Sequence, residues 1–203
     1  MIFSTTKAAE IQTNDVAYLG TGIHENVSFV NARTDKSSNG NNFIEFEFNK
    51  DGSKLTHTEW EPTKFSNQTD TEFEEKINKQ VARILQIMSP FYTKEQLNFE
   101  ASSFAAFAAW TVSLMNSADK TKLVRLKVIL GKNGYTSLPQ YAKYTFIESM
   151  SVATEASKIK ELKNIDNFTL ADIADKAKDA TSSAQYFGSA PAAAPVATGD
   201  APF

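Results

Sequence analysis

The residues of this chain that could do chemistry are of two kinds, and those suited to catalysis are few. The chain has two histidines and no cysteine, so it offers no thiol nucleophile and no cysteine-bound zinc. It also lacks the H-E-x-x-H, G-x-S-x-G and G-x-G-x-x-G motifs and any glycine-rich phosphate loop. We therefore expect a protein that is not an enzyme and that needs no metal and no cofactor.

Three titratable residues, His57, Glu59 and Glu61, alternate along one predicted strand and so share a face. Such a face could bind a divalent ion or transfer protons, although a metal site needs a further ligand that the sequence does not place. Charged residues on strands usually point to water, so we interpret this face as solvated, with His57 pairing with Glu59. A metal-assisted enzyme using these residues is the least favoured alternative.

Residues suited to binding are better represented. Aromatic rings that stack on bases, and cations that follow phosphates, are what single-stranded nucleic acid requires. Residues 122–150 hold five cations and one carboxylate, a net charge of +4. Arg125 and Lys127 alternate with apolar residues on a predicted strand, so both should point away from the core. The other candidates lie on the neighbouring strand, in loops or near strand ends: Lys143, Lys132, Tyr135, Trp60, Phe65, Arg33 and Lys36. The alternative is core packing for the rings and an ordinary solvated surface for the cations.

The elements that must position these residues begin with three strands, predicted at 23–33, 42–49 and 54–61. A polar loop containing Asn-Gly joins the first two, and an Asp-Gly turn joins the second and third. Two further strands are predicted, one within residues 122–130 and one over about 141–150. Alternation of apolar and polar side chains is the basis for all five.

Helical spacing replaces strand alternation over residues 69–117 and again over 151–180. Thr69 or Asp70 can cap the first helix, and a second helix should begin near Thr93 or Ser102. Residues 151–180 look amphipathic, with a short last helix that contains Ile173.

This order predicts an α+β, mostly β fold, a five-stranded OB-like barrel with a helical insertion between its third and fourth strands. The alternative is a general α+β sheet with helices on one face. We expect an OB-like nucleic-acid-binding domain over residues 1–150, with the insertion at about 69–117. A helical attachment at 151–180 should pack on the barrel or on a neighbouring subunit, and a tether should follow at 181–203.

The tether is mostly Ala, Pro, Ser and Gly, so it buries too little apolar surface to offset the entropy of ordering and should stay flexible. Yet it ends in Asp200, Ala201, Pro202 and Phe203. We interpret Asp200, Pro202 and Phe203 as a tip that a partner protein holds, with the ring in an apolar pocket and basic groups on the carboxylates. A frayed terminus is the alternative.

The tip resembles that of bacterial single-stranded DNA-binding proteins, which end in an acidic stretch closing on Asp-Ile-Pro-Phe. Residues 18–27 and 55–62 are similar to single-stranded DNA-binding proteins of tailed bacteriophages. The resemblance implies sequence-independent binding of single-stranded DNA by an OB-fold, and recruitment of replication or repair proteins by the tip. This chain departs from the bacterial pattern in its single tip acid, its large helical insertion and its helical stretch before the tether.

No apolar run reaches the length that spans a bilayer, and the N-terminus has no signal-peptide pattern, so we expect no membrane partner. The lack of cysteine fits a reducing compartment, and we expect a cytoplasmic protein, in the host cytoplasm if a phage encodes it. The alternative function is a non-catalytic structural or assembly protein whose helices make homo-oligomer contacts.

Overall fold

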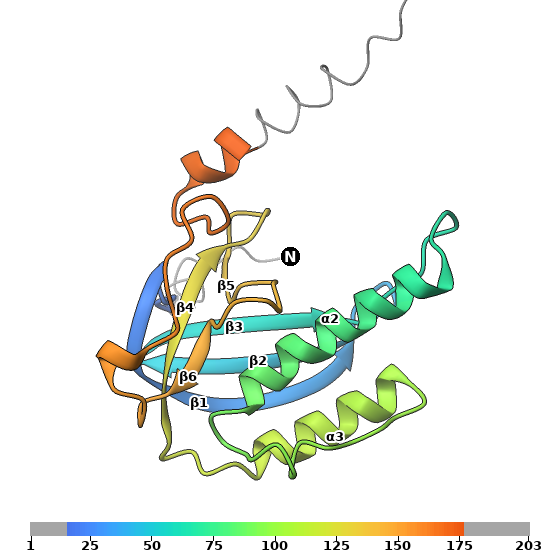
Figure 1. Cartoon of the computed structure of the whole chain (residues 1–203), viewed down its shortest axis with the longest axis horizontal. Coiled ribbons are helices and arrows are strands. Elements are labelled where there is room, and N and C mark those ends of the chain that lie inside the picture. Colours follow the sequence, from blue (N-terminus) through green and yellow to red (C-terminus); the bar gives the residue numbers. More distant parts are fainter. Residues whose placement is uncertain (1–15, 177–203) are drawn as a thin grey trace, which may run out of the picture.

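Three antiparallel strands form the meander that the sequence predicts: β1 (Gly22–Lys36), β2 (Asn42–Lys50) and β3 (Ser53–Trp60) (Figure 1). This structure, a computed structural model, describes residues 16–176 of the 203. The tether and the tip residues Asp200, Pro202 and Phe203 therefore lie outside the described residues.

The two hairpins have the turn chemistry that their sequences require. Between β1 and β2, Gly40 has a φ of 79°, and its N–H donates to the Ser37 carbonyl oxygen. Between β2 and β3, Asp51 and Gly52 have φ values of 50° and 84°, the paired left-handed conformation of a tight hairpin turn.

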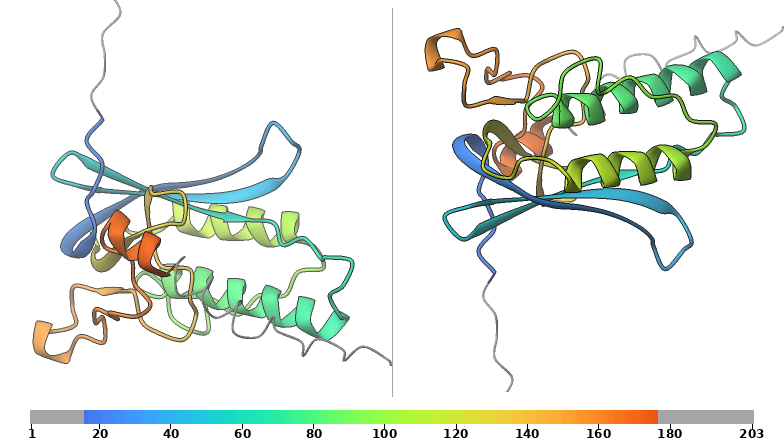
Figure 2. Two further views of the ribbon diagram at one scale, coloured as in Figure 1. Left: turned by 90° about the horizontal axis from the view of Figure 1, so that it is seen from above. Right: turned by 90° about the horizontal axis from the view of Figure 1, so that it is seen from below.

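Two helices follow, α2 (Asp70–Met88) and α3 (Phe104–Asn116). Thr69 and Glu72 form a capping box at the start of α2, and the Ser103 side chain caps α3. Both helices lie on the same side of the β1–β3 sheet, with α3 next to the sheet and α2 beyond it (Figure 2). No helix within residues 16–176 is both long and apolar enough to cross a membrane.

The remaining strands nearly close the sheet into a barrel. β4 (Leu123–Leu130) pairs with β1 on one edge, while β5 (Thr136–Ser137) and β6 (Ile147–Ser149) pair with successive parts of its other edge. β5 and β6 thus share one position, and the sheet has five positions in the order β3, β2, β1, β4 and β5/β6. A hydrogen bond of 2.9 Å between the His57 ring and Ser137 joins β3 to β5 across the seam. The predicted fold class is confirmed as a nearly closed antiparallel barrel, compatible with an OB-like fold.

The last predicted strand is wrong over most of its length. Only residues 147–149 of the expected 141–150 form a strand, because residues 138–145 leave the sheet after β5, and the chain pairs with β4 again only from Phe146, whose carbonyl oxygen accepts from the Lys127 N–H. Pro139, near the start of this excursion, is buried and has no N–H to donate to a strand ladder.

The helical stretch before the tether is present only in part. A 3₁₀ turn covers Thr154–Ala156, and residues 170–176 form the short helix around Ile173, but residues 157–169 are not helical. Backbone groups of this stretch are instead hydrogen-bonded to the side chains of Lys127, on β4, and of Asp166. The Lys160 carbonyl oxygen accepts from Lys127, and the Leu162 N–H donates to Asp166, which also pairs with Lys127. This stretch runs beside β4 (Figure 1).

The barrel interior is apolar and the outer face of β1–β3 is open. The interior includes Phe29, Phe46, Phe48 and Leu55, all at most 2% exposed. No element of the described chain covers the face of the sheet opposite the two helices (Figure 2). Side chains that alternate outward along β3 are therefore accessible to a ligand.

Candidate nucleic-acid interface

A cleft of about 990 Å³ lies where β3 ends and α2 begins, and two exposed aromatic rings line it. Trp60, the last residue of β3, is 48% exposed, and Phe65 in the linker to α2 is 62% exposed. The linker starts at Glu61 and Pro62, where the strand stops because proline has no N–H to continue the ladder. The structure thus brings together the two aromatic residues that the sequence predicted, at one cleft.

The cations of this cleft come from α2 and were missed by the sequence analysis. Lys76, Lys79 and Arg83 line the cleft at spacings of three and four residues, which place them on one helix face. The Lys76 ammonium lies 4.6 Å from the centroid of the Phe65 ring. Lys79 pairs with Glu75 at 3.4 Å on the exposed surface. The regular spacing opposite the apolar stripe of α2 is the signal that could have found them.

Carboxylates outnumber these cations by one. Glu59, Glu61, Glu72 and Glu75 also line the cleft, and Arg83 already pairs with Glu59 at 2.7 Å. The backbone N–H and the hydroxyl of Thr69 donate to Glu72 and lower the pKa of its carboxyl group, so this group stays charged near neutral pH. A ligand with both an uncharged aromatic part and negative charges suits such a cleft better than a simple anion does.

The outer face of the sheet continues from Trp60 toward the β1–β2 loop. Trp60 lies opposite Phe43 on β2, with ring centroids 5.1 Å apart, and the Arg33 guanidinium lies 5.1 Å from the Phe43 ring. Arg33 also pairs with Glu45 at 2.6 Å, whereas Lys36 at the end of β1 is exposed. Of the two predicted cations, Arg33 is therefore beside the aromatic site but already has a carboxylate partner.

Three further predicted residues lie away from this cleft. Lys132 and Tyr135 are both exposed in the β4–β5 loop, Tyr135 to 74%. Lys143 is exposed among residues 138–145, which leave the sheet, and not on a strand neighbouring β4; its ammonium lies 5.6 Å from the centroid of the Tyr144 ring. None of the three lines the cleft beside Trp60.

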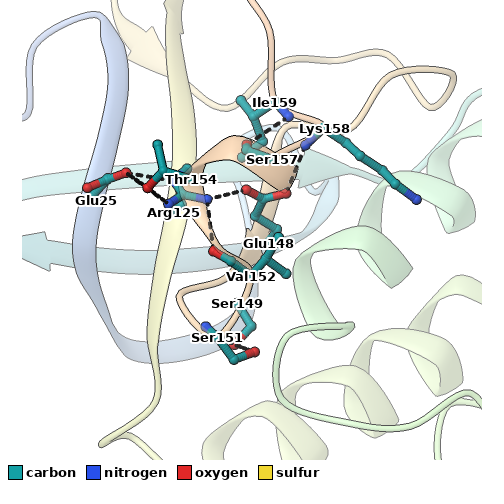
Figure 3. Close-up of polar contacts among 10 residues, drawn as sticks. All are labelled: Glu25, Arg125, Glu148, Ser149, Ser151, Val152, Thr154, Ser157, Lys158 and Ile159. Carbon is teal, nitrogen blue, oxygen red and sulfur yellow. Dashed lines mark hydrogen bonds and ion pairs between the residues drawn. The ribbon is translucent and has the colours of Figure 1, made fainter.

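Arg125 is not part of an open basic face, and the prediction that it is exposed is wrong. Its side chain is 3% exposed and is surrounded by polar partners (Figure 3). It pairs with Glu25 at 2.9 Å and with Glu148 at 2.6 Å, and it donates to the Val152 carbonyl oxygen and to Thr154. The hydrogen bonds that Arg125 donates to its carboxylate partners, Glu148 first, raise the pKa of Arg125. Arg125 therefore holds the chain after β6 against β4.

Lys127 is also buried, contrary to the prediction, with a side chain that is 0% exposed. Its ammonium lies 2.7 Å from Asp166, which is likewise 0% exposed, and 5.3 Å from the Tyr141 ring centroid. The Tyr141 hydroxyl donates to the same carboxylate. Strand alternation correctly places Lys127 away from the apolar core, but residues 157–166 cover that face.

His57 and Glu59 form a buried polar cluster, not the solvated face that we expected. They are 0% and 3% exposed, and Nε2 of His57 lies 3.2 Å from Oε1 of Glu59, which is the contact that we expected between them. Arg83 donates two hydrogen bonds to Glu59, and Gln80 donates a third. Burial raises the pKa of Glu59, but hydrogen bonds from Arg83 and His57 outweigh it and lower the pKa to about 2.

This cluster joins strands at the wall of the cleft, which Glu59, Gln80 and Arg83 line. His57 connects Glu59 to Ser137 across the barrel seam, but neither His57 nor Ser137 lines the cleft. Within residues 16–176, no three histidine, aspartate or glutamate side chains come together as a metal site would require. The cluster therefore stabilises the closure of the barrel beside the cleft.

Comparison of the chain with protein-family models, with curated proteins and with solved structures gave no match. The functional argument therefore depends on the fold and on the site. Together they define an OB-like near-barrel with an aromatic cleft of mixed charge at the end of β3.

Proposed function

We propose that this protein binds single-stranded DNA without reading its sequence, in replication, recombination or repair, through the cleft beside Trp60 and Phe65. The observation that carries the proposal is the pair of exposed rings at one cleft that α2 supplies with cations. OB-folds hold single strands in this way, by stacking bases on rings and by tracking phosphates with cations. The buried Arg125 and Lys127 have no part in the proposal.

In this proposal each ring stacks on a base, which is worth about 1–3 kcal/mol and tolerates any sequence. Lys76 and Lys79 would then meet the phosphates. Because Lys79 already pairs with Glu75, phosphates must compete with a carboxylate, so charge should contribute only modestly to affinity. With about two phosphates contacted, the logarithm of affinity should fall against the logarithm of salt with a slope of about −1.4.

The two tryptophans allow a direct test. Trp110 stacks on Phe99 with ring centroids 4.6 Å apart, whereas Trp60 is at the cleft. We expect oligo-dT to quench fluorescence of the Trp110→Phe variant, in which Trp60 is the reporter. Quenching should disappear in the Trp60→Phe variant, in which Trp110 is the reporter. Titration at several salt concentrations measures both the affinity and the slope.

A duplex of the same sequence is the control, and we expect it to bind much more weakly because its bases are already stacked. Quenching that follows Trp110 instead of Trp60 would move the site away from this cleft. Absence of quenching and of any mobility shift with oligo-dT would contradict the proposed function altogether.

A second candidate function, a structural or assembly protein, is favoured by the helices. α3 has no charged residue, and Phe73, Ile77 and Val81 on α2 are only half-buried although their spacing predicts a buried stripe. Such surfaces could make contacts between copies of the chain. Large species on a sizing column, together with no binding of oligo-dT, would favour this candidate over the first.

We also propose that the tip formed by Asp200, Pro202 and Phe203 recruits replication or repair proteins. Deleting residues 200–203 should leave the affinity for oligo-dT unchanged and should abolish capture of partner proteins from replicating cells. Phe203→Ala is the matched point variant, since it removes the ring and leaves Asp200 and Pro202 in place. Equal capture by the full-length and shortened chains would contradict this role.

A further inference from the structure

The segment that precedes β1 forms one parallel bridge with β3, at the edge of β3 that does not pair with β2. The Leu19 N–H donates to the Lys54 carbonyl oxygen at 2.8 Å, and the Lys54 N–H donates to the Ala17 carbonyl oxygen at 2.7 Å. These bonds make a parallel bridge between Tyr18 and Lys54. Paired residues in a sheet point to the same face, so Tyr18 faces the same side as Lys54.

That side is the open outer face of the barrel. Leu55, His57 and Glu59 point inward and are buried, so the alternate residues of β3, from Lys54 to Trp60, point outward. Leu19, next to Tyr18, is 5% exposed and points into the core, which confirms the outward direction of Tyr18. Tyr18 and Trp60 therefore lie on one face, at opposite ends of β3.

The Tyr18 ring has no evident role in folding. It is 68% exposed, and within residues 16–176 its hydroxyl makes no hydrogen bond and its ring makes no aromatic or cation–π contact. Trp60 is six positions beyond Lys54, which corresponds to about 20 Å of strand. Between the two rings the outward side chains of β3 are the uncharged Thr56 and Thr58.

We infer that the binding surface extends from the cleft along β3 to Tyr18, so that an unpaired strand stacks on rings at both ends of β3. This inference depends on the proposed function. The neighbouring strand β2 presents Glu45 and Glu47 in the adjacent outward row, opposite Thr58 and Thr56. Glu45 pairs with Arg33 and Glu47 pairs with Lys54, so this row offers phosphates no unpaired cation. The bases, which carry no charge, should therefore lie over the threonines.

The inference predicts an effect of Tyr18 that depends on ligand length. OB-folds hold about 4–16 nucleotides, so an oligo-dT of about 4 nucleotides can occupy the Trp60 cleft alone, whereas one of about 16 can also reach Tyr18. We expect Tyr18→Ala to weaken binding of the longer oligonucleotide by about fivefold or more, and binding of the shorter one by less than about twofold. Tyr18→Phe keeps the ring and should bind both like the wild type.

The full-length chain with fluorescein-labelled oligo-dT and anisotropy detection gives these affinities. Val16→Ala is the matched control, because Val16 is also exposed in the same segment but has no ring. Wild-type affinity of Tyr18→Ala for the longer oligonucleotide, with Trp60→Ala still weakened, would overturn the inference and leave the proposed function standing. No binding of either oligonucleotide by the wild type would overturn both.

Discussion

Replacing Lys127 with methionine should lower the free energy of unfolding by about 3–5 kcal/mol, the cost of breaking a buried ion pair by removing one partner. Methionine fills much of the volume of lysine but leaves the Asp166 carboxylate, 0% exposed, without its cation. The Lys160 carbonyl oxygen loses its donor as well. The hydrogen bonds that Tyr141 and Leu162 donate to Asp166 remain, but they do not neutralise its charge.

Urea unfolding followed by circular dichroism measures this loss. Lys143→Met is the matched control, because Lys143 is exposed, and its free energy of unfolding should stay within about 0.5 kcal/mol of wild type. Adding Asp166→Asn to Lys127→Met should recover part of the stability, since it removes the unpaired charge. Equal effects at Lys127 and Lys143 would mean that the ion pair does not hold residues 157–166 on β4.

The burial of Arg125 and Lys127 also makes variants of these residues unsuitable as a test of nucleic-acid binding. Reversing the charge of Arg125 or Lys127 would disrupt the chain that crosses β4, because both side chains are buried among its polar groups. A weaker affinity for oligo-dT in such variants would therefore report partial unfolding. Variants of Trp60, Lys76 or Lys79 test the cleft without partial unfolding of the chain over β4, since these side chains line the cleft.

Much of the barrel is predictable because its strands and turns are specified locally. The alternation of apolar and polar side chains predicts β2 within one residue of its observed bounds. Gly40 and Gly52, which the sequence places in the two turns, have the left-handed backbone conformation that such turns require. Thr69 likewise marks the start of α2, because a capping box needs only residues three positions apart.

The burial of the charged face of β4 could not be predicted in the same way. Alternation shows that Arg125 and Lys127 point away from the core, but it does not show what covers them. The partner of Lys127 is 39 residues further along the chain, in a stretch that lacks regular structure. The periodicity of Ile159 and Leu162 suggested a helix there, yet the backbone of this stretch is used to bind β4.

In the candidate site, too, residues placed by their sequence neighbours were predicted, and a residue placed by a long-range contact was not. Trp60 and Phe65 were predicted because they flank Pro62, at the end of a strand that is clear from sequence. Tyr18 was not, because its position depends on a parallel bridge to Lys54, 36 residues away. Exposure of a ring at such a bridge is a property of the folded sheet, and the residues around Tyr18 give no local signal for it.

Replacing Glu59 with glutamine should destabilise the protein at neutral pH by about 3 kcal/mol, and this loss should shrink in acid. Hydrogen bonds from Arg83 and His57 lower the pKa of Glu59 to about 2, against an ordinary value of 4.5. A carboxylate with a lowered pKa in the folded state stabilises fully above its unfolded pKa, and this contribution is lost as the pH falls through the folded value. The window is therefore about pH 4.5 to about pH 2.

Urea unfolding of wild type and Glu59→Gln across this range tests the charge directly. The difference in the free energy of unfolding should be constant above about pH 5 and approach zero near pH 2, because the protonated wild-type side chain then resembles glutamine. Glu74→Gln, at an exposed position on α2, is the control and should show little difference at any pH. A loss at Glu59 that does not change with pH would mean that the shape of the side chain, and not its charge, stabilises the seam between β3, β5 and α2.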